Sequence, residues 1–307
     1  MADTVYELDD FTLVGKDAER SETVNRPSIS YWQDAGRRLR SNKIAMIAMM
    51  VIALYALMAI LGPMMVPYQY NTTELTQNNL SMSKEHIFGT DALGRDLWAR
   101  VWVGARVSLM IGLVAAVIQT TIGVFIGGIS GYIGGNFDLI LMRIIDILNA
   151  VPFLIFVILI MMIFGAGVIP IIMAFAITGW IQMARLVRGQ VLQLKEQEFI
   201  LASKALGASP VRLIIKHLIP NMAGVIIVTL TMRIPQAIFT EAFLSYIGIG
   251  VKPPMTSWGQ LANMGAQCMR VYPYQLLIPA FFISTMMLAL QIFGDGLRDA
   301  LDPKQRR

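Results

Sequence analysis

Long runs of apolar residues without a charged side chain restrict the fold of this 307-residue chain more than any other feature. A helix that crosses about 30 Å of hydrocarbon needs about 20 apolar residues, at a rise of about 1.5 Å each. Residues 44–66, 107–130 and 274–293 are such runs. Charged residues make up only 15% of the chain, well below the roughly one quarter of soluble proteins. The sequence therefore predicts a multi-pass membrane protein.

The run from residue 147 to 184 is also uncharged, but as one helix of about 57 Å it is too long for a single span. Gly165, Gly167 and Pro170 mark the expected break. The third span then begins near Leu139, and the fourth extends from about residue 168 to Arg185. A fifth span at 222–248 completes an all-helical fold with six transmembrane helices.

Lys and Arg near the ends of the spans predict the orientation, because cytoplasmic loops retain these residues. Four precede the first span, six lie after the fourth span and four lie near the C-terminus. Both termini are therefore expected in the cytoplasm. Four basic residues in the opposite segment, 67–106, fit this rule poorly.

One membrane domain is expected, with no linker or internal repeat. Its parts are a cytoplasmic tail (1–43), the first span (44–66), an extracytoplasmic segment (67–106), a core of five spans (107–295) with a cytoplasmic loop at 196–220, and a cytoplasmic C-terminal tail (296–307). Residues 1–43 are polar, so no secretory signal is expected, and 1–27 are expected to be flexible. One cysteine cannot form an internal disulfide, and the basic residues form no single face for nucleic acid.

The segment 198–220 is a polar to amphipathic stretch between two apolar runs. Gly207 suits a left-handed helix end, and Ser209 followed by Pro210 suits the cap and first residue of the next helix. Four apolar residues at helical spacing predict one apolar face on that second helix: Val211, Ile214, Ile215 and Leu218. Arg212 and Lys216 point elsewhere. By itself this pattern also fits a helix that rests on lipid headgroups.

The segment 198–220 resembles the EAA loop through which permeases of ABC importers contact their ATPase. The resemblance implies that ten residues couple the chain to that ATPase: Glu198, Ala202, Ser203, Ala205, Gly207, Ala208, Ser209, Pro210, His217 and Pro220. With it, ATPase docking is favoured over the lipid-surface interpretation.

Two further stretches, HIFGTDALGRDLWARVWVGARVSL from His86 and EAFLSYIGIGVKPPMTSWG from Glu241, resemble the oligopeptide and dipeptide (Opp/Dpp) permeases. The resemblance covers about 43–303 and is to the C-type subunit; Ala99 stands where that family usually has Ser. Its extracytoplasmic motif residues are Gly89, Thr90, Asp91, Gly94, Arg95 and Asp96. By resemblance, the motif lies near the face that docks the binding protein.

The resemblance implies the type I ABC-importer permease fold in a bacterial cytoplasmic (inner) membrane. It implies four partners: a homologous B-type permease, two P-loop ATPases and an extracytoplasmic substrate-binding protein. ATP and Mg²⁺ would be bound by the ATPases, and no cofactor is expected in this chain. Peptide is the expected cargo, and the same family also serves nickel and other small solutes.

Charged residues in and near the spans are the candidate functional residues, because a charge in a membrane normally faces a bundle interior or a watery cavity. The candidates for the translocation path are Asp146, Asn149, Arg233 and Glu241. Arg233 is expected to attract a peptide carboxylate or, alternatively, to pair with Asp146 or with an acid of another chain. Asn149 with Pro152 predicts a hinge or a static kink.

Two smaller patterns concern packing. Asp91 with Arg95, and Asp96 with Arg100, have the i, i+4 spacing of helical ion pairs. We expect a solvated scaffold of small energetic effect, with contact to the substrate as the alternative. Gly123, Gly127 and Gly131 form a ridge suited to close helix contact, within the chain or with a partner.

No nucleotide-binding G-x-x-x-x-G-K-[ST] motif occurs, and neither does H-E-x-x-H or G-x-S-x-G. The chain is therefore expected to be a non-enzymatic subunit that receives energy from a partner. A competing class is a secondary transporter or channel in which Asp146, Arg233 and Glu241 relay an ion; it should contain inverted repeats. A membrane scaffold or sensor would leave the EAA resemblance unexplained.

Overall fold

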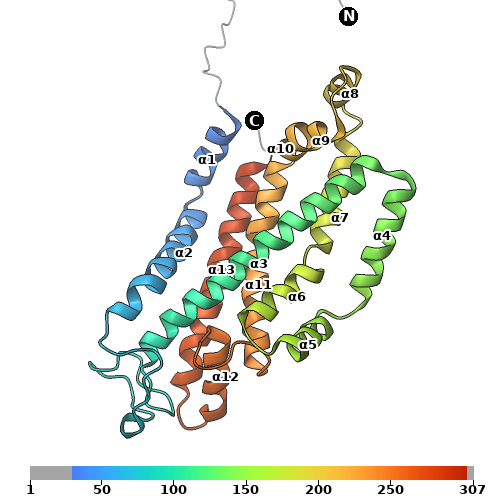
Figure 1. Ribbon diagram of the computed structural model, residues 1–307. Helices are drawn as coiled ribbons and strands as arrows, with labels where there is room; N and C mark the ends of the chain where they lie inside the picture. The colour runs from blue at the N-terminus through green and yellow to red at the C-terminus, as the bar shows by residue number, and fades with distance from the viewer. Residues whose placement is uncertain (1–29, 303–307) are drawn as a thin grey trace, which may run out of the picture.

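The computed structural model describes residues 30–302, and these are mostly helical (Figure 1). The N-terminal tail 1–27, expected to be flexible, lies outside the described residues. Short 3₁₀ turns occupy Gly62–Met64 and Leu75–Gln77. The α-helices are α1 (Tyr31–Ser41), α2 (Lys43–Leu61), α3 (Leu97–Ile133), α4 (Gly135–Ala150), α5 (Phe153–Phe164), α6 (Val168–Thr178), α7 (Ile181–Leu194), α8 (Glu198–Ala205), α9 (Pro210–Arg212), α10 (Ile219–Asn221), α11 (Ala223–Tyr246), α12 (Trp258–Cys268) and α13 (Tyr274–Leu301).

Five helical segments of the described chain are long and apolar enough to cross a membrane: Lys43–Met64, Leu97–Ile133, Val168–Leu194, Ala223–Tyr246 and Tyr274–Leu301. A sixth is formed by α4 and α5 together, which are bent by 79° at their junction. The bend follows from Pro152, because the residue before a proline is forced out of the helical region and Val151 is extended. Six spans are therefore present if the bent pair counts as one.

Helix limits differ from the sequence prediction in several places. α3 begins at Leu97 rather than near residue 107, because the Asp96 carboxylate caps it by accepting a hydrogen bond from the Ala99 N–H at 2.8 Å. Arg100 and Arg106 therefore lie on this helix of about 55 Å and not in a loop. α7 and α13 also extend beyond their predicted ends. α1 and α12 were not predicted, because each is shorter than a span.

α3 is the central helix of the bundle, and it packs against α2, α6, α7, α11 and α12. The glycine ridge of α3 faces α7: a side chain at Gly127 would collide with the Ala184 backbone, and one at Gly123 or Gly131 would collide with Met183 or Val191. The ridge therefore serves packing within this chain. Glycine permits this approach because it has no Cβ.

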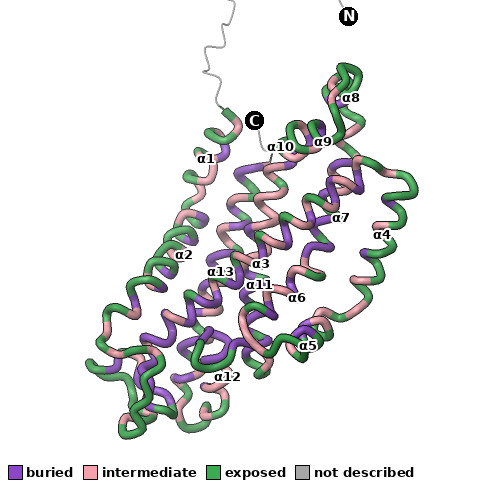
Figure 2. Tube along the Cα trace, viewed as in Figure 1, coloured by how far each residue is buried: buried purple, intermediate pink, exposed green. Residues whose placement is uncertain are grey.

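Two ends of the bundle are distinct in Figure 1. At one end, here called the α8 end, lie α1, the helices α8 to α10 and the C-terminal part of α13; the Tyr31 hydroxyl donates to the Leu301 carbonyl there at 3.0 Å. At the opposite end, the α12 end, α12 and the segment 62–96 cover the bundle. Much of the surface between the ends is exposed and apolar, as expected for contact with lipid (Figure 2).

Candidate functional site

The segment 198–220 folds at the α8 end into short helices joined by a sharp turn. Glu198 lies in the first turn of α8, where a carboxylate is favoured by the helix dipole. Gly207 has a φ of +83°, the left-handed conformation that its position predicted. The Ser209 hydroxyl caps the next helix, which begins at Pro210. The predicted turn chemistry is therefore confirmed at Gly207, Ser209 and Pro210.

The second helix of this segment buries only part of its predicted apolar face. Val211 and Ile215 are exposed, whereas Leu213 and Leu218 are completely buried together with Met183 and Met222. The reason is that Leu213–Leu218 forms a π-helix, whose hydrogen bonds connect residues five apart rather than four. The wider turn rotates the buried face away from the α-helical spacing, so Leu218 and Ile214 of the predicted face pack against the bundle while Val211 and Ile215 do not.

Five of the exposed side chains of the segment 198–220 are large and apolar, and they lie beside charged ones such as Lys204 and Arg212. Leu206 is 88% exposed, Val211 64% and Ile215 55%. Of the ten predicted coupling residues, seven are exposed and Ser203, Ala208 and His217 are half-buried. We call the exposed side chains of Phe199, Leu201, Leu206, Val211 and Ile215 the loop surface. An apolar patch of this kind, beyond the helical spans, is suited to contact with a partner.

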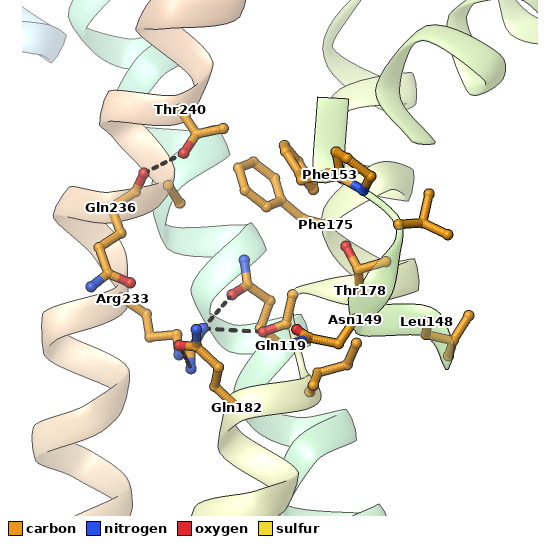
Figure 3. Close-up of a pocket in the computed structure, with 15 residues that line it drawn as sticks. Gln119, Leu148, Asn149, Phe153, Phe175, Thr178, Gln182, Arg233, Gln236 and Thr240 are labelled. Carbon is orange, nitrogen blue, oxygen red and sulfur yellow. Dashed lines mark hydrogen bonds between the residues drawn. The ribbon is translucent and has the colours of Figure 1, made fainter. Parts of the chain in front are cut away.

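A second candidate lies in the middle of the bundle, where a cavity of about 400 Å³ opens between α11, α7 and the α4–α5 bend (Figure 3). Arg233, near the centre of α11, is its one charged lining residue. Its guanidinium donates to the Gly179 carbonyl at 3.1 Å, to Gln182 Oε1 at 3.2 Å and to Gln119 Oε1 at 3.3 Å. The predicted path residue Asn149 lines the same cavity.

Asp146 and Glu241 lie apart from this cavity. Arg185 donates to the Asp146 carboxylate at 2.7 Å, and Arg143 lies 3.7 Å from it, so the alternative of an Arg233–Asp146 pair is wrong. Glu241 is fully buried and accepts hydrogen bonds from the Ser108 and Ser245 hydroxyls, each at 2.8 Å. The structure thus brings together two of the four predicted path residues, Arg233 and Asn149.

Sequence reasoning missed the ion pair that joins α4 to α7. Arg188 donates through two nitrogens to the Asp138 carboxylate, which also accepts from the Ser130 hydroxyl of α3. The partners are 50 residues apart, and no spacing rule connects them. The buried charge of Asp138 was the available signal, since a carboxylate at the start of a membrane helix requires a partner.

The charged motif at the α12 end is buried rather than solvated. Arg95 Nε lies 2.8 Å and Arg100 Nε 3.5 Å from Asp91 Oδ2, and all three side chains are at most 7% exposed. Asp96 does not pair with Arg100 as its spacing predicted, because its carboxylate caps α3 and contacts His86 Nδ1 at 2.8 Å. We call these five residues the buried charge cluster.

The motif segment itself is a compact turn and not a helix. Gly89 and Gly94 both have positive φ values, and the Thr90 hydroxyl accepts from the Leu80 N–H and donates to the Gln77 carbonyl. The helical spacing that predicted two ion pairs therefore does not apply before Leu97. Within residues 30–302, no group of three or more His, Cys, Asp or Glu side chains is placed to hold a metal ion.

Comparison with known families identifies two matching regions. The family "Binding-protein-dependent transport system inner membrane component" matches residues 123–307. The family "N-terminal TM domain of oligopeptide transport permease C" matches residues 30–81. Together they include the loop surface, Arg233 and the first span.

Curated relatives match nearly the whole chain. It is 52% identical to the oligopeptide transport system permease protein OppC of Bacillus subtilis, covering 97% of both chains. It is 49% identical to the dipeptide transport system permease protein DppC of the same organism, covering 97% of this chain and 93% of that one. OppC of Escherichia coli K12 is 43% identical, over 93% and 95% of the respective chains.

Solved structures support the fold. Two crystal forms of the MetNI methionine ABC transporter, described as inward facing, contain a chain that superposes with TM-scores of 0.51 and 0.53. Each match covers 66% of this chain and 97% of the other, at 21% and 20% identity. At that identity, the likeness concerns the arrangement of helices alone.

Proposed function

The chain belongs to the oligopeptide and dipeptide branch of the ABC-transporter permeases, and on this premise we propose that it forms half of the path of an ATP-driven peptide importer. A homologous B-type permease supplies the other half. Two P-loop ATPases drive the cycle by binding and hydrolysing ATP with Mg²⁺, and an extracytoplasmic binding protein delivers the peptide.

The observation that carries this proposal is the loop surface at the α8 end. Its apolar side chains project from two short helices, while Ile200, Leu213 and Leu218 of the same segment are buried and hold it against α7. A partner that binds the loop surface and moves can therefore transmit that movement to α7 through these buried contacts. Closure of the ATPases moves the segment 198–220 and shifts the bundle between inward-facing and outward-facing arrangements. The mechanism is thus coupling between two stable conformations.

The distribution of charge supports a cytoplasmic position for the α8 end. Basic residues on α1, on α7 and on the segment 198–220 lie at this end, and cytoplasmic loops retain such residues. Both chain termini are then cytoplasmic, and the α12 end with its buried charge cluster faces the binding protein. The membrane is the cytoplasmic (inner) membrane of a bacterium.

Co-purification tests this proposal. The chain is tagged, extracted gently from its native membrane and analysed by mass spectrometry for the proteins that accompany it. Wild type is compared with Leu206→Asp, which puts a charge on the loop surface, and with Gly207→Asp, which also disturbs the turn. Gly36→Asp on α1 is the matched control, because nothing lies within 4 Å of a Cβ at that glycine.

Two ATPases and a second permease should accompany wild type and the control, and the ATPases should be lost from both loop variants. A wild-type chain that purifies alone would contradict the importer and favour a secondary transporter or channel. ATPases that remain on both loop variants would contradict docking at the loop surface. Uptake of labelled peptide, with nickel as the alternative cargo, then assigns the substrate.

A further inference from the structure

We propose that the cavity around Arg233 binds the C-terminal carboxylate and main-chain amides of a peptide during transport, an inference that rests on the importer function above. The cavity lies where α11, α7 and α3 meet the α4–α5 bend, near the middle of three spans (Figure 3). Its volume of about 400 Å³ is within the usual size of a ligand pocket. The sequence predicted Arg233 and Asn149 on the translocation path, but not the other amides that gather around them.

The cavity carries one positive charge that no acid of the described chain balances. All three groups that accept from Arg233 are neutral: a backbone carbonyl and two side-chain amides. Asp146 pairs with arginines of its own surroundings, and the Glu241 carboxylate is enclosed by serines. An anion that enters the cavity therefore meets an available cation.

A carboxylate is the anion that this arrangement suits best. A guanidinium presents its donors as a planar fork that can hold both oxygens of a carboxylate. Hydrogen bonds between ionised groups are about twice as strong as those to neutral acceptors, so a carboxylate displaces Gln119 and Gln182 from Arg233. Every linear peptide with a free C-terminus carries this group.

The remaining lining matches a peptide main chain. Four side-chain amides line the cavity, Gln119, Asn149, Gln182 and Gln236, and two threonines, Thr178 and Thr240, add hydroxyls. An amide offers both a donor and an acceptor, as a peptide unit does. Phe153 and Phe175, stacked 5.2 Å apart, form an apolar wall. Such a site recognises the end and backbone of a peptide with little dependence on its side chains.

Transport of two peptides that differ in this one charge tests the proposal. The purified importer is reconstituted in proteoliposomes with its binding protein, and uptake of tri-alanine is compared with uptake of its C-terminal amide, each at a concentration that saturates the binding protein. Arg233→Gln should slow uptake of the free acid about tenfold or more, the effect of losing a charge-assisted hydrogen bond. Uptake of the amide should stay within about twofold of wild type.

Gln182→Glu is a second variant that does not depend on removing Arg233. It places a carboxylate where an oxygen already lies 3.2 Å from the guanidinium, so the charge is neutralised within the chain. The same selective loss of free-acid uptake is expected. Gln33→Glu, the same change on the exposed face of α1, is the matched control and should leave both rates unchanged, because a glutamate there still accepts from the Ser30 N–H. Arg233→Lys should retain part of the preference.

Equal loss of both peptides from an assembled complex that still hydrolyses ATP would overturn the proposal, and would point to an acid of the partner permease as the counter-ion. Unchanged uptake of both peptides by Arg233→Gln would overturn it too. If the complex with Arg233→Gln does not assemble, Gln182→Glu tests the proposal in its place, by whether uptake of the free acid is lost selectively. Failure of the importer function is a separate result, because wild type would then contain no ATPase and take up neither peptide.

Discussion

The two ends of the bundle differ in which side chains they bury and which they expose. At the α12 end, the charges of the buried charge cluster are paired within the chain: Arg95, Arg100 and His86 face its two carboxylates, although Arg100 Nε makes no hydrogen bond. At the α8 end, apolar side chains such as that of Leu206 are exposed. Charges that are paired within the chain need no partner, whereas an exposed apolar surface is suited to contact with one.

Two ion pairs with identical spacing make this contrast quantitative. Asp34–Arg38 on α1 and Asp91–Arg95 at the α12 end are both separated by four residues, at 3.0 and 2.8 Å. The side chains of the first pair are 30% and 26% exposed, and those of the second are 3% and 7% exposed. Spacing therefore identifies a pair but not its energetic weight, which depends on burial.

The largest effect is expected from Asp91→Asn, which leaves two buried arginines without their carboxylate. Removing one partner of a buried ion pair costs about 3–5 kcal/mol. Thermal unfolding of the detergent-purified complex should show this loss. Asp34→Asn is the matched control and should cost less than about 1 kcal/mol, because its pair is partly exposed. Equal losses for both would break the contrast between the two ends.

Two glycines with positive φ sharpen the comparison at the level of the backbone. At Gly94 a Cβ would collide with the Glu74 carbonyl, while at Gly207 it would meet nothing within 4 Å. Gly94→Ala should cost about 3 kcal/mol or more, from left-handed strain and steric overlap together. Gly207→Ala should cost only the strain, about 1 kcal/mol. Denaturant unfolding of each variant measures the difference, and similar values would refute the packing at the α12 end.

Alanine substitutions within the segment 198–220 test which face of the second helix is buried. Leu213→Ala should destabilise the protein by about 2–3 kcal/mol, the low part of the range for buried leucines, because a loop can partly collapse into the space. Val211→Ala should change stability by less than about 0.5 kcal/mol. The reverse order would restore the regular α-helical face and contradict the π-helix.

The smallest effect concerns the connection between α13 and the segment 62–96. The Tyr274 hydroxyl donates to the Leu80 carbonyl at 2.9 Å and lies 3.2 Å from the Thr90 carbonyl. Tyr274→Phe should cost about 1 kcal/mol, the usual net value of one hydrogen bond. Tyr272→Phe is the control, since its hydroxyl has no hydrogen-bond partner among residues 30–302. Equal melting temperatures for the two variants would show that this connection contributes nothing.

Much of the secondary structure followed from sequence patterns that are local. The apolar runs located the spans to within about ten residues, and Pro152 located the bend between α4 and α5. Gly207 and Ser209 predicted a turn that the structure confirms. The errors are also local in origin: α3 was begun too late because its first turns carry arginines, which a hydropathy rule places in water.

The site followed from sequence only in part. Arg233 was identified because placing a charge at the bilayer centre costs about 2.5–3.5 kcal/mol of insertion free energy, so such a residue normally faces a bundle interior or a watery cavity. Glu241 has the same signature in the same helix, yet serines from α3 and α11 enclose it. Which of the two charges faces a cavity depends on helices far away in the chain, so hydropathy could not separate them.

The sequence by itself determined that this chain spans a membrane, where its helices lie and where its loop turns, because chain length, apolar runs and turn residues act over a few neighbours. Only the tertiary structure decided which charges are enclosed, which face of the π-helix is buried and which amides gather around Arg233. The physical reason is that burial and charge pairing depend on contacts between residues far apart in the sequence, and local spacing carries no information about those contacts.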